Sequence, residues 1–259
     1  MCKLYMDDNI KARNQLGGFI LLQLVDIKKY YKNKKAVDGI SFEVNEGEIF
    51  GLIGANGAGK STTIAMVATM LKPDSGDILF EGASIIKKPS VIRRHLGYVP
   101  QEISLYSALT GMDNLLFWGN AYHVPKEKLS ERIKEVCDMI GFDENILKQK
   151  VSTYSGGMKH RLNIGTALLH HPKLVVLDEP TAGIDIVARN QILNSVLKLK
   201  ETGTTVLYCG HYMEEVEKIC DRICMLHNGK IIDIRTKEEL LNNPEKNLET
   251  IYLEAIGQA

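Results

Sequence analysis

The stretch from Gly54 to Thr62 constrains this chain most strongly, because it fits the phosphate-binding loop pattern G-x-x-x-x-G-K-S/T. An apolar run over residues 49–53 precedes the loop and predicts a buried strand, and residues 62–71 after it predict a helix. This strand–loop–helix context is the one that the motif requires, so we expect a nucleoside triphosphate site. The loop residues are Gly54, Ala55, Asn56, Gly57, Ala58, Gly59, Lys60, Ser61 and Thr62.

Each residue type in this loop has a physical reason to be there. Gly54, Gly57 and Gly59 let the backbone bend so that successive N–H groups point at an anion. The N-terminus of the following helix adds partial positive charge. Lys60 can reach the terminal phosphates, and the Ser61 hydroxyl can ligate Mg²⁺. The alternative is a glycine-rich turn with a solvated lysine, but the full pattern in its context favours the phosphate site.

The composition is that of an ordinary globular protein. The 259 residues are 44% hydrophobic and 25% charged, which excludes a disordered or fibrous chain and allows one large domain or two small ones. Lysine and arginine together number 32, as do aspartate and glutamate. Because the formal net charge is zero, electrostatics gives no reason to expect a nucleic acid partner.

Neither a membrane span nor a disulfide framework is expected. No apolar run approaches the roughly 20 residues that cross a bilayer, since Gln23 and Asp26 interrupt the candidate that begins at Phe19. Residues 1–14 lack the apolar core of a signal peptide, so we expect a cytosolic protein that reaches a membrane only through a partner. The cysteines are odd in number and fit no metal-binding spacing. We therefore expect reduced thiols, four of them packed, among Cys2, Cys137, Cys209, Cys220 and Cys224.

Short apolar strands alternate with helices in the second half of the chain, which predicts a parallel sheet covered on both faces. Strands are expected over 174–177 and 205–208, with helices over 186–200 and 214–220. Residues from about 104 to 168 have a helical pattern and predict an inserted helical part. Further strands are expected at 20–27, 41–44, 77–80 and 97–99, a hairpin at 222–226 and 230–234, and short helices at 236–241 and 248–256.

A second motif, residues 174–180, delivers two adjacent carboxylates at the end of an apolar strand. Parallel sheets of α/β proteins bind ligands at the carboxyl ends of their strands. Asp178 is placed to hold Mg²⁺, and Glu179 could polarise an attacking water as a general base. An Asp-Glu-Pro turn after a core strand is common, but the phosphate loop upstream favours the functional interpretation.

A third motif places Ser155 before Gly156 and Gly157, at the start of an apolar-periodic stretch. Ser155 would cap a helix whose first backbone amides form a second anion site. A capped helix start without a ligand is the general alternative. One phosphate chain does not need two cradles in the same molecule, so the second cradle would serve the nucleotide of a partner.

Together these motifs resemble those of the ATP-binding-cassette (ABC) ATPases. The resemblance runs from about Leu21 to Leu240 and rests on the order of the phosphate loop, Gln101, Ser-Gly-Gly, Leu-Asp-Glu-Pro-Thr and His211. The exporter branch of this family, which carries drugs, ions or polysaccharide, has sequences similar to three stretches of this chain. These are Tyr-Ser-Gly-Gly-Met-Lys, His-Tyr-Met-Glu-Glu and the tail over 248–253.

The resemblance implies an α/β fold. It would consist of a P-loop NTPase (RecA-like) core with a mainly parallel sheet, an N-terminal antiparallel β subdomain and a helical insertion subdomain at about 104–168. Residues 1–18 would form an N-terminal extension, residues 19–245 the ABC ATPase domain, and residues 246–259 a C-terminal helical tail.

The resemblance also implies that two cassettes dimerise head to tail and enclose two ATP molecules. The dimer would be a homodimer or a heterodimer with a second ABC ATPase. Each phosphate loop would face the partner's Ser155 and its two glycines. Tyr31, with Tyr30 as the alternative, would stack on adenine. Asp185 would cross the dimer interface, besides capping the helix that follows it.

Three polar residues would carry the hydrolysis in this family. Glu179 would activate the water, His211 would hydrogen-bond the γ-phosphate, and Gln101 would contact Mg²⁺ and the attacking water. The metal ligands would thus be Ser61, Gln101 and Asp178. The segment after Gln101 would also carry the docking surface for a membrane partner.

The chain departs from the family pattern at a few positions. Ala55 stands where proline is usual, which needs no side chain and changes little. Tyr154 replaces a leucine, as is common in this branch, and His160 replaces a frequent arginine. Gly210 precedes His211 where threonine or serine is usual, which predicts a looser backbone at that histidine.

The sequence therefore predicts the ATP- and Mg²⁺-dependent ATPase subunit of a membrane exporter, bound at the cytoplasmic face to a separate transmembrane permease subunit. One alternative is a soluble cassette ATPase of DNA repair, cluster assembly or translation, which usually has coiled-coil insertions, two cassettes in one chain or a basic face. Another is a non-hydrolysing scaffold gated by nucleotide, against which the intact Glu179 argues. The cargo is not indicated, since the membrane partner selects it.

Overall fold

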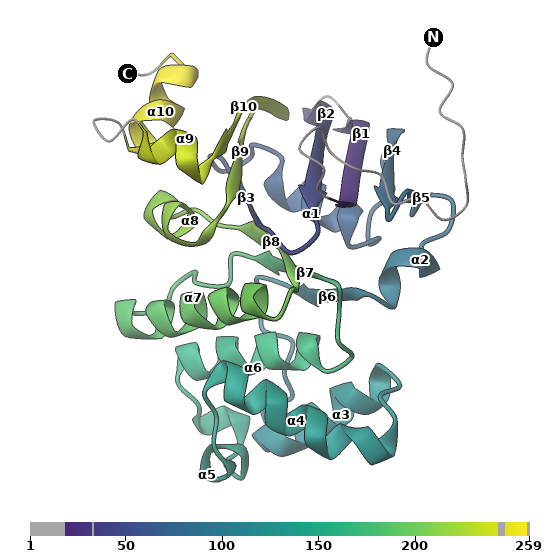
Figure 1. The fold of residues 1–259 in the computed structure, drawn as a ribbon, viewed down its shortest axis with the longest axis vertical. Coiled ribbons are helices and arrows are strands. Elements are labelled where there is room, and N and C mark those ends of the chain that lie inside the picture. The colour runs from purple at the N-terminus through teal and green to yellow at the C-terminus, as the bar shows by residue number, and fades with distance from the viewer. Residues whose placement is uncertain (1–18, 33, 243–246, 258–259) are drawn as a thin grey trace.

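The computed structural model describes residues 19–32, 34–242 and 247–257, which form two β-sheets and a set of flanking helices (Figure 1). One sheet has six strands in the order β10-β9-β3-β8-β7-β6, and the other has four in the order β2-β1-β4-β5. The strands are β1 (Ile20–Tyr31), β2 (Lys34–Asn45), β3 (Ile49–Ile53), β4 (Ser75–Phe80), β5 (Ala83–Ser84), β6 (Leu96–Val99), β7 (Leu174–Asp178), β8 (Thr205–Cys209), β9 (Arg222–His227) and β10 (Lys230–Thr236).

The helices fall into two groups. In Figure 1, α3 to α6 gather at one end of the molecule, and the four-stranded sheet lies toward the opposite end. The α/β fold, with an antiparallel β part and a helical part, is as predicted. The helices are α1 (Lys60–Val67), α2 (Ser90–Arg93), α3 (Gly111–Ala121), α4 (Lys126–Ile140), α5 (Glu144–Leu147), the 3-10 helix η1 (Val151–Thr153), α6 (Gly156–Leu168), α7 (Ile186–Glu201), α8 (Met213–Ile219), α9 (Lys237–Leu241) and α10 (Leu248–Ala255).

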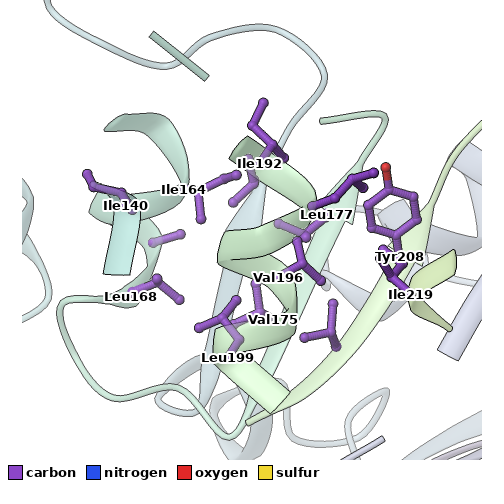
Figure 2. Close-up of a cluster of buried hydrophobic side chains, with 14 of the residues drawn as sticks. Ile140, Ile164, Leu168, Val175, Leu177, Ile192, Val196, Leu199, Tyr208 and Ile219 are labelled. Atoms are coloured by element: carbon purple, nitrogen blue, oxygen red, sulfur yellow. The ribbon is translucent and has the colours of Figure 1, made fainter. Parts of the chain in front are cut away.

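The six-stranded sheet is parallel except at one edge, where β10 pairs antiparallel with β9. Strands β3, β7 and β8 are buried along their whole length, as expected of central strands covered on both faces. Because side chains alternate along a strand, Val175 and Leu177 of β7 enter one core, and Leu174 and Val176 enter another. Figure 2 shows part of the first core, which includes Ile192 of α7.

Apolar packing and one buried arginine hold the helices of the helical part together. Helix α4 buries Ile133, Val136 and Ile140 in the same core as α6 and α7. The guanidinium of Arg132 donates to the carbonyls of the last residue of α6 and of its successor, Leu169. Carbonyls at a helix C-terminus lack intrahelical partners, so this arginine satisfies them and fixes α4 against α6.

Three predicted elements have clearly different bounds in the structure. The first two strands are longer than expected, because the lysine- and tyrosine-rich stretch between them continues as a hairpin in which Tyr31 is opposite Lys34. Its exposed side chains hide the alternation that marks a half-buried strand. The helix after the phosphate loop ends at Val67 rather than Leu71. It ends there because Thr69 adopts a φ of 59° and the next two N–H groups both bond back to the Ala65 carbonyl.

Several local predictions are confirmed. Strands β9 and β10 form the expected hairpin, and Thr236 caps α9 through a reciprocal hydrogen-bond pair with Glu239. Gly141 ends α4 in the left-handed conformation. The four cysteines within the described residues are free and buried, whereas Cys2 and the expected extension over residues 1–18 lie outside them. In the described part of the chain, none of the helices has the length and apolarity to cross a bilayer.

The core between β7 and α7 should carry much of the stability. We expect Ile192→Ala to lower the free energy of unfolding by about 2–5 kcal/mol, because it leaves a cavity at a fully buried position. The matched control is Ile186→Ala on the same helix, which is 69% exposed and should change stability by less than about 0.5 kcal/mol. Urea titration followed by circular dichroism measures both. Equal losses from the two variants would contradict this account of the core.

Candidate nucleotide-hydrolysis site

The candidate site lies where four neighbouring parallel strands end. Strand β3 leads into the phosphate loop, β6 into Gln101, β7 into Asp178 and Glu179, and β8 into His211. The strands lie side by side in the order β3-β8-β7-β6, so these segments reach the same edge of the sheet although they are far apart in sequence.

The phosphate loop has the close backbone packing that its glycines predict. Gly59 adopts a φ of 108°, and a Cβ atom there would lie 2.4 Å from the Ala36 carbonyl oxygen, so no other residue fits without movement. The ammonium group of Lys60 is buried and donates to the carbonyl of Gly54 at 2.7 Å and to that of Ala55 at 3.3 Å. Lys60 is thus held over the loop, at the N-terminus of α1.

A cavity of about 200 Å³ opens beside this loop. Its lining combines loop backbone, basic groups and the carboxylate of Glu179, which suits a polyanion held near a hydrolytic group. Eight of the sequence-predicted site residues line this cavity. The lining residues are Tyr31, Lys34, Ala36, Asn56, Gly57, Gly59, Lys60, Ser61, Thr62 and Glu179.

Of the two tyrosines considered for adenine stacking, Tyr31 is the one that lines the cavity. It is 48% exposed at the end of β1, so its ring is available to a ligand. The Tyr30 hydroxyl instead donates to Asp38 at 2.6 Å, and this bond is the main cause of the raised pKa of Tyr30. The geometry therefore favours Tyr31.

The other two predicted catalytic residues, His211 and Gln101, both contact Glu179. Its Oε2 lies 2.6 Å from His211 Nε2 and accepts a hydrogen bond from Gln101 Nε2 at 3.0 Å. The residue is buried and adopts a φ of 51°, a left-handed conformation that is uncommon outside glycine and is found at functional sites. The Glu179 N–H donates to the Cys209 carbonyl at 2.9 Å, which joins the turn after β7 to the end of β8.

Asp178 has the properties of a metal ligand. Its Oδ1 is buried and, among the described residues, has no hydrogen-bond partner. Burial, followed by the nearby Glu179 carboxylate, raises the pKa of Asp178, while the Cys209 thiol hydrogen-bonds to its charged form. A divalent cation would offset both the burial and the repulsion, and carboxylate oxygen is a ligand that Mg²⁺ accepts. The donor set therefore fits Mg²⁺.

The Ser-Gly-Gly segment caps α6 as predicted. The Ser155 side chain accepts from the Met158 N–H at 3.2 Å, and Gly156 and Gly157 form the first turn. A Cβ atom on Gly157 would lie 2.3 Å from the Ala188 side chain, so this glycine allows α6 to approach α7 closely.

Asp185 is confirmed as the N-cap of α7. Its carboxylate accepts from the N–H groups of Ala188 and Val187, which lowers its pKa. Of the residues that the structure describes, those lining the cavity beside the phosphate loop include neither Asp185 nor the segment from Ser155 to Gly157. One chain alone does not bring these motifs to the phosphate loop.

Tyr252 of the C-terminal helix is a residue that the sequence analysis did not connect with the site. Its hydroxyl accepts from the Ala55 N–H at 3.1 Å, donates to the Leu226 carbonyl at 3.3 Å, and lies 3.4 Å from His227 Nδ1. Proline, usual at position 55 in the resembling family, has no N–H to donate. The signal that could have revealed this contact is therefore Ala55 together with the tyrosine in the tail.

Known proteins resemble this chain in sequence and in fold. Residues 37–182 match the family described as ABC transporter. The chain belongs to the ABC transporter family. It is 50% identical over 220 residues to the linearmycin resistance ATP-binding protein LnrL of Bacillus subtilis (strain 168), covering 85% of this chain and 70% of that protein. It is 37% identical to the daunorubicin/doxorubicin resistance ATP-binding protein DrrA of Streptomyces peucetius, over 87% of this chain and 68% of that one.

A solved structure also resembles this cassette. It is the dimeric post-hydrolysis state of the ATP-binding cassette MJ0796 bound to ADP and Pi, with a TM-score of 0.75, 25% identity, and coverage of 84% of this chain and 99% of that chain. The ABC protein described here is accordingly an ATP-binding and ATP-hydrolysing transporter subunit, as the sequence predicted. This finding disfavours the non-hydrolysing scaffold.

The contact between Tyr252 and the phosphate loop gives a testable consequence. We expect Tyr252→Phe to weaken nucleotide binding by up to about tenfold, the range of a single net hydrogen bond, because the base of the loop loses an anchor. Ala55→Pro removes the same N–H and should have a similar effect. Titration with a fluorescent ATP analogue measures both, and Tyr106→Phe, on an exposed ring, is the control. Wild-type affinity in both variants would show that the contact does not support the loop.

Proposed function

We propose that this cassette powers an exporter by hydrolysing ATP at the edge of its parallel sheet, with Glu179 as the general base. The observation that carries the proposal is the placement of the Glu179 carboxylate, which lines the cavity beside the phosphate loop and contacts both Gln101 and His211. The export direction and a small organic cargo are inferred from the names of its relatives, two of which are resistance proteins.

The residues divide the work of binding. The phosphate loop and Lys60 hold the phosphates, and Tyr31 stacks on the base. Ser61, Gln101 and Asp178 form the proposed Mg²⁺ site, supported by Oδ1 of Asp178, which has no hydrogen-bond partner among the residues that the structure describes. When bound, Mg²⁺ neutralises charge that develops on the phosphates.

Hydrolysis then depends on three side chains. Glu179 accepts a proton from the attacking water, and Gln101 orients that water. His211 hydrogen-bonds the γ-phosphate and holds Glu179, so that base and phosphate keep a fixed relative position.

The second half of each site comes from a second cassette. The segment from Ser155 to Gly157 and the Asp185 loop lie outside the cavity in this chain, which supports a head-to-tail dimer in which they face the phosphate loop of the partner. A similar cassette was solved as a dimer bound to ADP and Pi, which supports the pairing of two cassettes. The second cassette is either another copy of this chain or a different ABC ATPase, depending on which subunits the transporter contains.

A patch of exposed apolar side chains is the proposed docking surface for the transmembrane subunit. It consists of Ile103, Tyr106, Leu109, Leu116 and Phe117, which are 36–47% exposed on the segment after Gln101 and on α3. The Tyr106 and Phe117 rings are in edge contact at 4.7 Å. Such a cluster of large apolar groups on one surface is typical of an interaction site.

A cavity of about 650 Å³ adjoins the docking patch through a series of ring contacts. Trp118 and Tyr122 connect Phe117 to the rim, and Arg93 and Arg94 supply positive charge there. We propose that a helical segment of the transmembrane subunit lays its apolar side chains on the patch and places an acidic end in the cavity. The cassette would then sit peripherally at the cytoplasmic membrane face.

This function also divides the chain. Residues 19–245 would be the ABC ATPase domain, with the helical subdomain at about 104–168 carrying the docking patch and the Ser-Gly-Gly segment. Residues 1–18 would be an extension and residues 246–259 a tail, of which Tyr252 reaches back to the phosphate loop.

Removal of the proposed base should separate binding from turnover. We expect Glu179→Gln to keep ATP affinity within about twofold and to lower kcat by about 10²-fold or more, because the amide keeps the shape but cannot accept the proton. Phosphate release measures kcat, and a fluorescent ATP analogue measures affinity. Glu102→Gln, an exposed carboxylate beside Gln101, is the control. Undiminished turnover in Glu179→Gln would reject the assigned base.

The docking patch is tested by co-purification. In mild detergent, the wild-type chain should recover an integral membrane protein in stoichiometric amount, identified by mass spectrometry. We expect Phe117→Asp to lose this partner while ATP binding persists, because a charge in the patch opposes burial against an apolar helix. Leu241→Asp, at a site that is 69% exposed on α9, should retain the partner. Recovery of only a soluble protein or nucleic acid with the wild type would instead support a soluble cassette.

A further inference from the structure

We infer that Glu215 of α8 is a positioning residue that holds the loops carrying Glu179, Asp185 and His211 in one arrangement. The inference rests on the roles proposed above for those three residues. Glu215 is only 3% exposed, so its carboxylate is available to neighbouring side chains rather than to a ligand in solution.

The Glu215 carboxylate accepts hydrogen bonds from two hydroxyl groups and forms an ion pair with one arginine. The Thr181 hydroxyl and the Tyr208 hydroxyl both donate to its Oε2 at 2.7 Å. Arg189 Nε lies 3.0 Å from its Oε1. Thr181 follows Glu179 by two residues. Tyr208 lies near the end of β8, three residues before His211, and Arg189 lies in the first turn of α7, soon after Asp185. One carboxylate therefore connects all three loops.

The bond between Tyr208 and Glu215 closes a short loop that has His211 near its tip. Tyr208 precedes the histidine by three residues and Glu215 follows it by four. Figure 2 shows Tyr208 beside the apolar core, with its hydroxyl oxygen directed away from Ile219. The bond from this hydroxyl to the buried Glu215 carboxylate is charge-assisted and therefore stronger than a neutral hydrogen bond.

This bond also explains how the chain tolerates Gly210. A Cβ atom at position 210 would lie 2.8 Å from the Tyr208 ring, so the ring occupies the space that a threonine or serine would need. The glycine alone would leave the backbone before His211 free to adopt many conformations. The Tyr208–Glu215 bond restricts that backbone from the other side.

Arg189 extends the same contact to the segment proposed to face the partner cassette. Its backbone N–H makes the helical hydrogen bond to the carbonyl of the cap residue Asp185 at 2.9 Å, and its guanidinium lies 4.1 Å from the centre of the Tyr212 ring. Tyr212 directly follows His211. The Arg189–Glu215 ion pair and the Arg189–Tyr212 cation–π contact thus hold the start of α7 against the histidine loop. A partner cassette that binds at Asp185 would therefore contact a segment that is already fixed relative to Glu179 and His211.

The positioning role predicts a loss of turnover without a loss of binding. We expect Glu215→Gln to lower kcat by about tenfold or more, since the Arg189 ion pair is lost and the loops separate, while the affinity for a fluorescent ATP analogue stays within about twofold. The control is Glu214→Gln, the adjacent exposed carboxylate on the same helix, which should keep wild-type kcat. Tyr208→Phe, which removes one of the two hydroxyl donors to Glu215, should lower kcat by a smaller factor.

Two results would overturn the inference. One is a Glu215→Gln variant that turns over ATP as fast as Glu214→Gln. The other is a parallel fall in kcat and nucleotide affinity, which indicates a general structural role. If Glu215→Gln does not fold, Tyr208→Phe and Arg189→Lys carry the test, and wild-type kcat in both rejects the inference. A Glu179→Gln variant that keeps its turnover would reject the proposed base instead, so the two failures are distinguishable.

Discussion

The parallel pairing of β3, β8, β7 and β6 is the constraint on which the site depends. The register places Cys209, the last residue of β8, opposite both Leu52 of β3 and Asp178 of β7. The phosphate loop, the two carboxylates and the histidine loop therefore begin at the same level of the sheet. Parallel strands need both faces covered, and the two apolar cores that flank the sheet meet this need. The core is thus what keeps motifs distant in sequence within hydrogen-bond reach.

At this edge, local strain and buried charge are balanced by specific partners. Glu179 adopts a left-handed conformation, and a backbone bond to Cys209 together with side-chain bonds to Gln101 and His211 maintains it. Asp178 keeps an oxygen to which no group in the described part of the chain hydrogen-bonds, as expected of a group reserved for a cation. The remaining parts, the capped start of α6 and the Asp185 cap of α7, lie outside the cavity. In the function proposed above, a second cassette supplies them and completes the site.

Much of this could be predicted from the sequence, because the decisive signals are local. The glycine spacing around Lys60 defines a backbone conformation, Ser155 before a helical period defines a cap, and an apolar run ending in Asp178 defines a central strand. The hairpin that presents Tyr31 was underestimated, since exposed lysines and tyrosines conceal its alternation. The contacts of Glu215 could not be predicted, and Ala55 was the single indirect signal for that of Tyr252, because each joins elements whose proximity only the tertiary fold establishes. Sequence patterns locate the chemical groups, whereas the side chains that hold them depend on packing.

The central claim is that one chain holds only part of each hydrolysis site and a second cassette completes it. Sedimentation velocity of the purified Glu179→Gln chain, with and without saturating ATP, tests this most directly, because slow turnover lets the closed state accumulate. The account predicts a monomer without nucleotide and a dimer with ATP, and it predicts that the additional change Ser155→Arg abolishes the dimer while nucleotide binding remains. A chain that binds ATP yet stays monomeric at all accessible concentrations, with or without a second ABC ATPase, would contradict the account.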